Sequence, residues 1–334
     1  MEVSRGGVWN VLVLGAGPAG CAAALQARHD GLTVLVLESR MVDRPQPGET
    51  LHPGIEPLFD RLGVRTAVLQ AGFPRHTGIW VAWEGTQPSF EAYGESDGVA
   101  WRGFQADRLR LRAALLDTAV QAGAEFVRGY APTALLVRAG RVSGVIANGT
   151  EIEAHWTIDA TGKDRWLARH LDLATMRRSP QILARYGWLA SGRPGADCNP
   201  RLTATEHGWH WRAPLGQDRL AWVEATIGAV PPAPGIDVTW CLTEKSAGPG
   251  YFLVGDAGIV LDPASSHGVL RAIMTAMFAV SHISGAVRAG TTEAAAARHY
   301  RDWLRDWFET DRNAMLQLYR RHMSPSIRRR FADF

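Results

Sequence analysis

The residues with the clearest chemical role form a glycine-rich turn between an apolar strand and a helix. The turn spans residues 15–20 and reads Gly-Ala-Gly-Pro-Ala-Gly, directly after the apolar segment Val11–Leu14. A helix of small residues runs on to Arg28, and a second apolar strand, Thr33–Leu37, ends at Glu38. In such a turn the three glycines permit the tight bend, let the backbone approach a pyrophosphate, and bring the helix close to the strand. The unpaired N–H groups at the helix N-terminus attract phosphate groups.

The acid at the end of the second strand narrows the choice of ligand. Glu38 lies 18 residues past Gly20, where a carboxylate can bind both hydroxyls of a ribose and would repel a 2′-phosphate. The pattern therefore predicts a site for FAD or NAD rather than NADP. The alternative is a glycine-rich turn in an unrelated α/β domain. The residues expected to contact the dinucleotide are Gly15, Gly17, Pro18, Ala19, Gly20, Glu38, Ser39 and Arg40.

Two further motifs follow the turn in chain order. Asp-Ala-Thr-Gly stands at Asp159–Gly162 after a predicted strand, and Gly-Asp-Ala stands at Gly255–Ala257 after the apolar strand Tyr251–Val254. A polar loop, Asp262–Gly268, leads from the third motif into a helix predicted over Val269–Arg288. The sequence contains neither a second dinucleotide fingerprint nor a Cys-x-x-Cys redox pair. A separate NAD(P)H-binding domain is therefore not expected.

The elements that must position these motifs follow two alternating patterns. Apolar strands and amphipathic helices, such as the helix predicted over Asp107–Ala122, indicate a parallel α/β sheet. Short aromatic strands between Pro and Gly turns, such as those predicted over Leu202–Trp211 and Val238–Leu242, indicate an antiparallel sheet. We expect an α/β fold in which a Rossmann-like dinucleotide-binding domain is interleaved with a smaller antiparallel β-sheet substrate domain and is followed by a C-terminal helix. The dinucleotide-binding parts are expected at 1–75, 101–174 and 248–290, the substrate sheet at 76–100 and 175–247, and the C-terminal helical segment at 291–334.

Composition and charge argue against several classes of function. A net charge of +3 over 334 residues gives no reason to expect a nucleic-acid partner or an anionic membrane surface. No uninterrupted apolar run reaches the roughly 18 residues of a membrane span. The three cysteines have no metal-ligand spacing, so no metal site is expected and a reducing compartment fits best. The chain passes from Met1 towards its first strand without a signal-peptide pattern, and a cytoplasmic location is expected.

The three motifs in this order resemble the FAD-binding fold of the para-hydroxybenzoate hydroxylase group of flavoproteins, which includes aromatic hydroxylases, flavin-dependent halogenases and geranylgeranyl reductases. The resemblance covers most of the chain and implies FAD as the cofactor. It assigns the ribityl hydroxyls to Asp256 and the pyrimidine edge of the flavin to the N-terminus of the helix that begins near Gly268. Asp159 and Gly162 look structural. The electrons are expected from transiently bound NAD(P)H or from a separate flavin reductase.

The same resemblance implies further contacts to the cofactor. Arg44 and Arg102 are candidates for contacts to the pyrophosphate, and an exposed position in solvent is the alternative for both. The other residues expected at the cofactor are Glu49, Thr50, Gly255, Pro263, Ser266, Gly268 and Val269.

The sequence also resembles the tryptophan-halogenase branch of this group, with two departures. Gly208–Leu215 is similar to the WxWxIP motif of these enzymes, and Gly48–Thr50 is similar to their GEA(T/S) loop. The halogenases use a lysine shortly before a strand that ends in Trp, but the corresponding position lies near Arg75 and no lysine precedes Lys163. They also carry a glutamate in the loop after the third motif, where this chain has Ser265. Arginine does not replace a lysine amine in this chemistry, so halogenation is the less expected activity.

The segment Pro263–Met274 resembles flavoproteins that mature the quinone cofactors of other enzymes, such as those with cysteine tryptophylquinone. This resemblance implies hydroxylation of an aromatic, indole-type substrate through a flavin C4a-hydroperoxide, and a tryptophan side chain of a partner protein is one candidate substrate. The catalytic candidates are His267 in the flavin-facing loop and His52, although each histidine can instead be a packing residue. Trp209 and Trp211 can form an aromatic wall for the substrate or pack within the sheet.

Several functions stay open on the sequence alone. The first is the FAD monooxygenase described above, and the second is a flavin-dependent reductase or dehydrogenase of an apolar substrate. The third is a non-catalytic, FAD-stabilised assembly factor for a partner enzyme. Flavin-dependent halogenation is a further alternative, weakened by the missing lysine and glutamate. Incorporation of oxygen into the product would separate the monooxygenase from the reductase.

Overall fold

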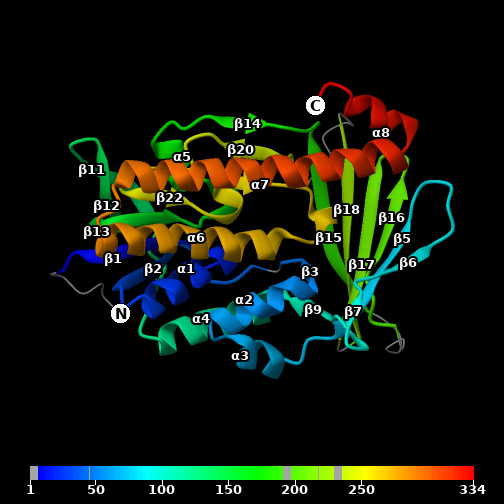
Figure 1. Ribbon diagram of the computed structural model, residues 1–334, viewed down its shortest axis with the longest axis horizontal. Helices are drawn as coiled ribbons and strands as arrows, with labels where there is room; N and C mark the ends of the chain where they lie inside the picture. The colour runs from blue at the N-terminus through cyan, green and yellow to red at the C-terminus, as the bar shows by residue number, and fades with distance from the viewer. Residues whose placement is uncertain (1–6, 45, 191–196, 217, 229–234) are drawn as a thin grey trace.

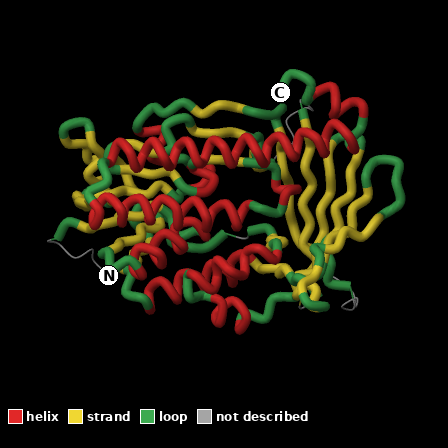
Figure 2. The backbone as a smooth tube through the Cα atoms, viewed as in Figure 1, coloured by secondary structure: helices red, strands yellow, loops and turns green. Residues whose placement is uncertain are grey.

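Two β-sheets joined by long helices form the frame of the molecule (Figure 1). The computed structural model describes residues 7–44, 46–190, 197–216, 218–228 and 235–334. The expected start of the chain before the first strand, residues 1–6, lies outside these ranges. The sheet that carries the N-terminal strands lies at one end of the long axis, and the antiparallel sheet lies at the other (Figure 2). The mixed α/β fold with an antiparallel sheet and C-terminal helices is confirmed.

The first sheet is parallel where the sequence motifs lie. Its parallel strands have the order β10-β2-β1-β13-β22, so the three motifs follow the neighbouring strands β1, β13 and β22. An antiparallel meander of β13, β12 and β11 extends the other part of the sheet. The strands of this sheet are β1 (Trp9–Leu14), β2 (Val34–Glu38), β10 (Glu125–Arg128), β11 (Pro132–Arg138), β12 (Arg141–Ala147), β13 (Thr150–Asp159), β21 (Ala247–Gly248) and β22 (Tyr251–Leu253).

Both faces of this sheet are covered, which explains why its strands are continuously apolar. Val11 and Val13 of β1 belong to the larger core, together with α1, α4 and α6, whereas Leu12 and Leu14 belong to a smaller core on the other face with α5. Asp107 begins the predicted helix α4 as its N-cap, because its carboxylate accepts hydrogen bonds from the first turn. The helices are α1 (Pro18–His29), α4 (Arg108–Gln121), α5 (Trp166–His170), α6 (Gly268–Ala289) and α7 (Glu293–His322).

Helix α6 runs through the centre of the molecule between α1 and α7. Among the helices that the structure describes, it alone has the length and apolar composition of a membrane span. Arg271 and His282 interrupt the apolar run of this helix, so the sequence shows no uninterrupted apolar segment of that length. In the most apolar 18-residue stretch of this helix, 61% is buried inside the protein.

The second sheet has the strand order β19-β15-β18-β17-β16-β5-β6 and is antiparallel except for the pairing of β16 with β5. The single strand predicted over Leu202–Trp211 is wrong, because the chain reverses at Glu206 and His207 to form the hairpin of β16 and β17. This turn contains no Pro, Asn or Asp, so it gave a weak signal. The strands are β5 (Gly78–Ala82), β6 (Ser89–Ala92), β15 (Ile182–Ala190), β16 (Arg201–Thr205), β17 (Gly208–Gly216), β18 (Arg219–Ile227) and β19 (Ile236–Asp237).

Small sheets and short helices complete the fold between the two large sheets. The prediction that Val238–Leu242 forms one strand of the antiparallel sheet is wrong. The preceding strand β19 pairs with β15 of that sheet, whereas the following strand β20 pairs with β14 and β23 in a separate small sheet. Gly48–Thr50, interpreted as a loop, lies in a strand that pairs with β9. The remaining strands are β3 (Gly48–Leu51), β4 (Arg75–His76), β7 (Glu95–Ser96), β8 (Val99–Ala100), β9 (Gly103–Asp107), β14 (Thr175–Arg177), β20 (Cys241–Thr243) and β23 (Ile259–Val260). The remaining helices are α2 (Glu56–Arg61), α3 (Arg65–Gln70) and α8 (Pro325–Arg330), with 3-10 turns at Pro53–Ile55, Gly162–Asp164, Gly255–Ala257 and Pro263–Ser265.

Candidate active site

A cavity of about 730 Å³ lies at the carboxyl ends of β1, β13 and β22, and we call it the cofactor cavity. Ligands of open parallel sheets bind at this edge. The cavity extends to the antiparallel sheet, where Tyr186, Trp209 and Trp211 line it. All three sequence motifs therefore open into one space.

The glycine-rich turn after β1 has the geometry that each glycine was expected to provide. Gly15 has a φ of +97°, and a β-carbon there would lie 2.6 Å from the Ala160 carbonyl oxygen. A β-carbon at Gly20 would lie 1.9 Å from the Gly15 carbonyl oxygen, so this glycine lets α1 pack closely against the turn. A β-carbon at Gly17 would meet no atom within 4 Å, because Gly17 faces the cofactor cavity. No side chain caps α1, which leaves its first N–H groups free for an anion.

Glu38 is held at the rim of this turn by backbone groups. One of its carboxylate oxygens accepts a hydrogen bond from the Ala16 N–H at 3.3 Å, and the other accepts from the Arg40 N–H at 3.0 Å. Arg112 from α4 lies 3.6 Å from the same carboxylate and donates to the Ala16 carbonyl at 2.7 Å. The carboxylate is therefore positioned where a ribose would need an acceptor.

The second motif holds its own loop together. Asp159 is buried and accepts hydrogen bonds from the Thr161 N–H and hydroxyl and from the Leu167 N–H, at 2.9, 2.6 and 2.8 Å. Burial raises the pKa of this carboxyl group, and these hydrogen bonds oppose the shift. The expected structural role of Asp159 agrees with this bonding.

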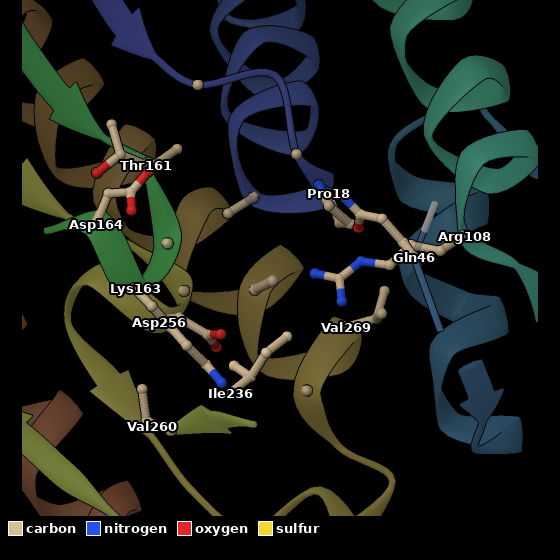
Figure 3. Close-up of a pocket in the computed structure, with 18 of the residues that line it drawn as sticks. Pro18, Gln46, Arg108, Thr161, Lys163, Asp164, Ile236, Asp256, Val260 and Val269 are labelled. Atoms are coloured by element: carbon tan, nitrogen blue, oxygen red, sulfur yellow. The ribbon is translucent and has the colours of Figure 1, made fainter. Parts of the chain in front are cut away.

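Charged side chains line two opposite sides of the cofactor cavity (Figure 3). Asp256 and Lys163 lie next to each other, and Arg108 reaches into the cavity from α4. Burial lowers the pKa of the Lys163 ammonium, and the carboxylate of Asp256 opposes this shift. Arg108 pairs with Glu49 at 3.1 Å, and burial raises the pKa of the Glu49 carboxyl group.

The residues of the cofactor cavity fit a flavin dinucleotide. Two helices, α1 and α6, begin at the cavity without a side-chain cap, so each offers free N–H groups to a negatively charged group. The carboxylates of Glu38 and Asp256 add acceptors for ribose and ribityl hydroxyls. The open space at Gly17 leaves room for a pyrophosphate against the backbone.

Most of the residues predicted at the cofactor do line this cavity. The exceptions are Gly20, which lies beneath the turn, Arg102, and the two histidines His52 and His267. The predicted residues that line it are Gly15, Gly17, Pro18, Ala19, Glu38, Ser39, Arg40, Arg44, Glu49, Thr50, Gly255, Asp256, Pro263, Ser266, Gly268 and Val269.

Arg102 is not among the residues that line the cofactor cavity. Arg102 precedes β9 and is exposed, and its carbonyl accepts a hydrogen bond from Arg75. Arg102 precedes the far end of β9, three residues before Gln105, which pairs with the cavity residue Thr50; this is roughly 10 Å along the strand at the usual rise per residue. Arg108, at the near end, takes the place expected for an arginine. Sequence reasoning missed Arg108, Arg112 and Lys163, although Lys163 directly follows the second motif.

A second cavity of about 290 Å³ lies on the other side of the Pro263–His267 segment. The segment alternates between the two spaces: Pro263 and Ser266 line the cofactor cavity, whereas the residues between and after them line the second cavity. Trp209 lines both cavities. The second cavity is lined by Trp83, Leu202, Ala204, Trp209, Ala264, Ser265, His267, Asp311, Ala314, Met315, Leu318, Tyr319 and Met323.

A buried hydrogen-bond network fixes the partition between the cavities. The Asp262 carboxylate is fully buried and accepts from the Ala264 N–H at 2.9 Å, from Trp240 Nε1 at 3.2 Å and from the Tyr319 hydroxyl. The Tyr319 hydroxyl in turn accepts from Trp209 Nε1 at 2.9 Å. Burial raises the pKa of both Asp262 and Tyr319. The loop, the sheet and α7 are thereby tied together at one point.

The two catalytic candidates lie close to each other and near the second cavity. The rings of His52 and His267 are 5.8 Å apart at their centroids, and only His267 lines the cavity. His52 Nδ1 accepts a hydrogen bond from the Gly54 N–H at 3.0 Å. Burial lowers the pKa of both imidazoles, so both rings are neutral at pH 7. His267 can therefore accept or donate a proton at the cavity wall.

The position expected for a halogenase lysine is closed off in this fold. Arg75 donates hydrogen bonds to the Gly103 carbonyl at 3.0 Å and to Glu56 at 2.9 Å, and its guanidinium stacks on the ring of Phe104. It lines neither cavity. Lys163 and Lys245 are the only lysines of the sequence; Lys163 lies in the cofactor cavity and Lys245 is exposed.

Comparison with known proteins places the chain among flavin-dependent enzymes. Residues 10–101 and 97–223 match the tryptophan halogenase family. Tryptophan 2-halogenase of Chondromyces crocatus is 25% identical over 343 residues, which cover 87% of this chain and 63% of that enzyme. The chain thus spans less than two thirds of the length of this relative.

Solved structures share the fold at lower identity. The myxobacterial chondrochloren halogenase CndH superimposes with a TM-score of 0.85 at 22% identity, covering 96% of this chain and 84% of CndH. PqsL, a probable FAD-dependent monooxygenase from Pseudomonas aeruginosa, superimposes with a TM-score of 0.79 at 18% identity, covering 98% of this chain and 99% of PqsL.

These similarities agree with the geometry of the cofactor cavity, which fits FAD. The sequence match extends over the glycine-rich turn, the second motif and most of the antiparallel sheet. The chain belongs to the tryptophan halogenase family of FAD-dependent enzymes.

Proposed function

We propose that this protein is an FAD-dependent monooxygenase that hydroxylates an aromatic, indole-type substrate held in the second cavity. The observation that carries the proposal is the wall of that cavity. It consists of aromatic and aliphatic side chains, a serine, a histidine and a carboxylate, with no lysine among the lining residues named above. Halogenases of this branch depend on a lysine amine, so this wall favours oxygen transfer.

The position of the second cavity supports the same assignment. It is separated from the cofactor cavity by the Pro263–His267 segment and by Trp209. Oxygen transfer requires the ring to reach the flavin past this segment, and alignment of the two groups there can contribute several kcal/mol to the reaction.

The chain itself supplies binding, exclusion of water and proton transfer. When bound and reduced, FAD would supply the activation of O₂. Buried apolar side chains of the second cavity, including Leu202 and Met315, would shield the reacting ring from water. His267 is neutral and can accept the proton that the ring loses when the hydroxyl group replaces it.

Halogenation is the second candidate, because family membership favours it. In that case the amine must come from Lys163, the only lysine that lines the cofactor cavity among the described residues. Substitution Lys163→Met would then abolish halogenation, whereas a monooxygenase would need Lys163 only for cofactor binding.

Product analysis tests the proposal. The FAD-loaded protein is supplied with NAD(P)H, a flavin reductase, indole, ¹⁸O₂ and sodium bromide, and the products are analysed by mass spectrometry. We expect an indole product that carries ¹⁸O and no bromine. A brominated product would establish the halogenase, and a reduced product without ¹⁸O would support a reductase of an apolar substrate. Binding of FAD without any reduction would support the assembly factor.

The finer prediction concerns a substrate on a partner protein. A tryptophan side chain modified during quinone-cofactor maturation stays a prediction that rests on the Pro263–Met274 segment. A tryptophan-containing peptide in the same assay, compared with free indole, distinguishes the two kinds of substrate.

A further inference from the structure

One charged side chain stands out in the second cavity. Asp311 lies on α7, and it is the only aspartate, glutamate, lysine or arginine among the described residues that line this cavity. It shares the cavity-facing side of α7 with Ala314, Met315 and Leu318, which are spaced as one helical face. A carboxylate on an otherwise apolar wall calls for a reason, because burying a charge is unfavourable unless it is paired.

Arg271 provides part of that reason. Its Nη1 lies 3.2 Å from Oδ2 of Asp311, and its Nη2 donates to the Ser265 hydroxyl oxygen at 3.2 Å. The Arg271 side chain is only 4% exposed, whereas the Asp311 side chain is 23% exposed. Arg271 lines the cofactor cavity and Asp311 lines the second cavity. The ion pair therefore crosses the partition between them.

The arrangement leaves one carboxylate oxygen available. Arg271 occupies Oδ2, and Oδ1 of Asp311 accepts no hydrogen bond from the part of the chain that the structure describes. The Ser265 hydroxyl does not serve it, because that hydroxyl donates to the Asp262 carbonyl at 2.8 Å. Oδ1 is thus an acceptor without a partner in the described chain, on a residue that lines the second cavity.

We propose that Asp311 is a substrate-binding residue that accepts a hydrogen bond from an N–H group of the aromatic substrate, and that Arg271 positions it. The inference rests on the proposed function for the idea that the second cavity holds the substrate. It adds the chemical class: an aromatic ring with a ring N–H or an attached amino group. Halogenases of this branch carry a glutamate in the loop where this chain has Ser265. In this chain the carboxylate that lines the second cavity together with Ser265 belongs to Asp311 of α7.

Binding of two matched probes to the oxidised, FAD-loaded protein tests this assignment without turnover. Indole and benzofuran have the same shape, but only indole has an N–H donor. A hydrogen bond to a carboxylate changes binding by roughly tenfold or more, so calorimetry with the wild-type protein should give at least this preference for indole. In Asp311→Asn the preference should fall severalfold, since a neutral amide oxygen is a weaker acceptor.

Two further variants separate binding from folding. Arg271→Met/Asp311→Leu removes the whole ion pair, so no buried charge is left alone, and it should bind indole and benzofuran equally. Asp306→Asn changes an exposed aspartate on the same helix and should keep the wild-type preference. Thermal melting and FAD content verify that each variant is folded.

Several results would overturn the assignment. These are equal binding of the two probes by the wild-type protein, a preference that survives in both Asp311 variants, or binding of neither probe. The proposed function fails separately: Asp311-dependent binding of indole without any ¹⁸O product would contradict the monooxygenase but keep the role of Asp311. Conversely, an ¹⁸O product together with an unchanged probe preference in Asp311→Asn would contradict only the role of Asp311.

Discussion

The cofactor cavity and the second cavity are neighbours that are built in different ways. Backbone turns after β1, β13 and β22 form the cofactor cavity, and its key positions are glycines and helix N-termini. Trp83 after β5, side chains from β16 and β17, the Pro263–His267 segment and α7 form most of the second cavity. Short local motifs therefore form the cofactor cavity, whereas packing between distant segments forms the second cavity. This division explains how one fold can serve several chemistries.

The largest effect is expected from a change beneath the glycine-rich turn. In Gly20→Ala the new β-carbon would lie 1.9 Å from the Gly15 carbonyl oxygen, so the turn or α1 must shift. We expect a loss of ~3 kcal/mol or more in the free energy of unfolding together with loss of bound FAD. Gly17→Ala is the matched control: its β-carbon meets nothing, so it should fold normally and only weaken FAD binding. Urea denaturation and FAD titration measure both effects, and equal stability of the two variants would contradict this view of the turn.

A change in the partition should affect stability without affecting the cofactor turn. Tyr319→Phe removes the hydroxyl that joins Trp209 Nε1 to the Asp262 carboxylate. Trp209 Nε1 loses its partner and the buried Asp262 carboxylate loses one of its three donors, which should lower the free energy of unfolding by about 1–3 kcal/mol. Tyr130→Phe, at a partly exposed position, should change it by less than about 0.5 kcal/mol. If both variants unfolded at the same urea concentration, the network would not be what holds the partition.

The two arginines at the ends of β9 distinguish the predicted cofactor contact from the one in the fold. Arg108→Met removes the partner of the buried Glu49 carboxylate and a positive charge from the cofactor cavity. We expect FAD to bind about tenfold more weakly, a loss of ~1.4 kcal/mol. Arg102→Met, at an exposed position, should stay within about twofold of the wild type. The reverse order of effects in an FAD titration would restore Arg102 as the contact.

The smallest effect concerns the histidine of the second cavity. Burial lowers the pKa of His267 in the folded protein, while an unfolded histidine keeps a pKa of about 6.5. The unfolded state therefore binds more protons as the pH falls through about 6.5, and stability falls with it. In His267→Gln this part of the pH dependence should disappear, so unfolding measured at pH 5.5 and 7.5 should differ less than in the wild type. An unchanged difference would mean that His267 is not buried as a neutral group.

Much of the cofactor cavity could be predicted because its residues act locally. Gly15, Gly20 and Glu38 belong to one strand–turn–helix–strand unit, and their roles follow from backbone geometry that the sequence pattern encodes. Asp256 could be placed because its motif also ends a buried strand. The sequence did not reveal β9 or its direction, so it could not show that Arg108, and not Arg102, lines the cavity.

The second cavity could not be predicted because it depends on contacts between distant segments. Asp311 and Tyr319 share one face of α7, and from the sequence such a face indicates packing only. Which element it packs against is decided by the path of the whole chain. His267 was singled out because its loop carries a motif. Asp311, which lines the same cavity, had no such local signal in the sequence. The hairpin of β16 and β17 was predicted as one strand, so Leu202 and Ala204 of β16 could not be placed at the same cavity as Trp209 of β17.

The central claim is that FAD binds in the cofactor cavity and the aromatic substrate binds in the second cavity. A ligand that carries a heavy atom tests this claim directly. Crystals of the FAD-loaded protein soaked with 5-bromoindole would locate the bromine by its anomalous scattering. We expect the bromine signal in the second cavity, between His267 and the Asp311 face of α7, with FAD in the cofactor cavity. A signal within the cofactor cavity in place of FAD, or a signal only outside both cavities, would contradict the account.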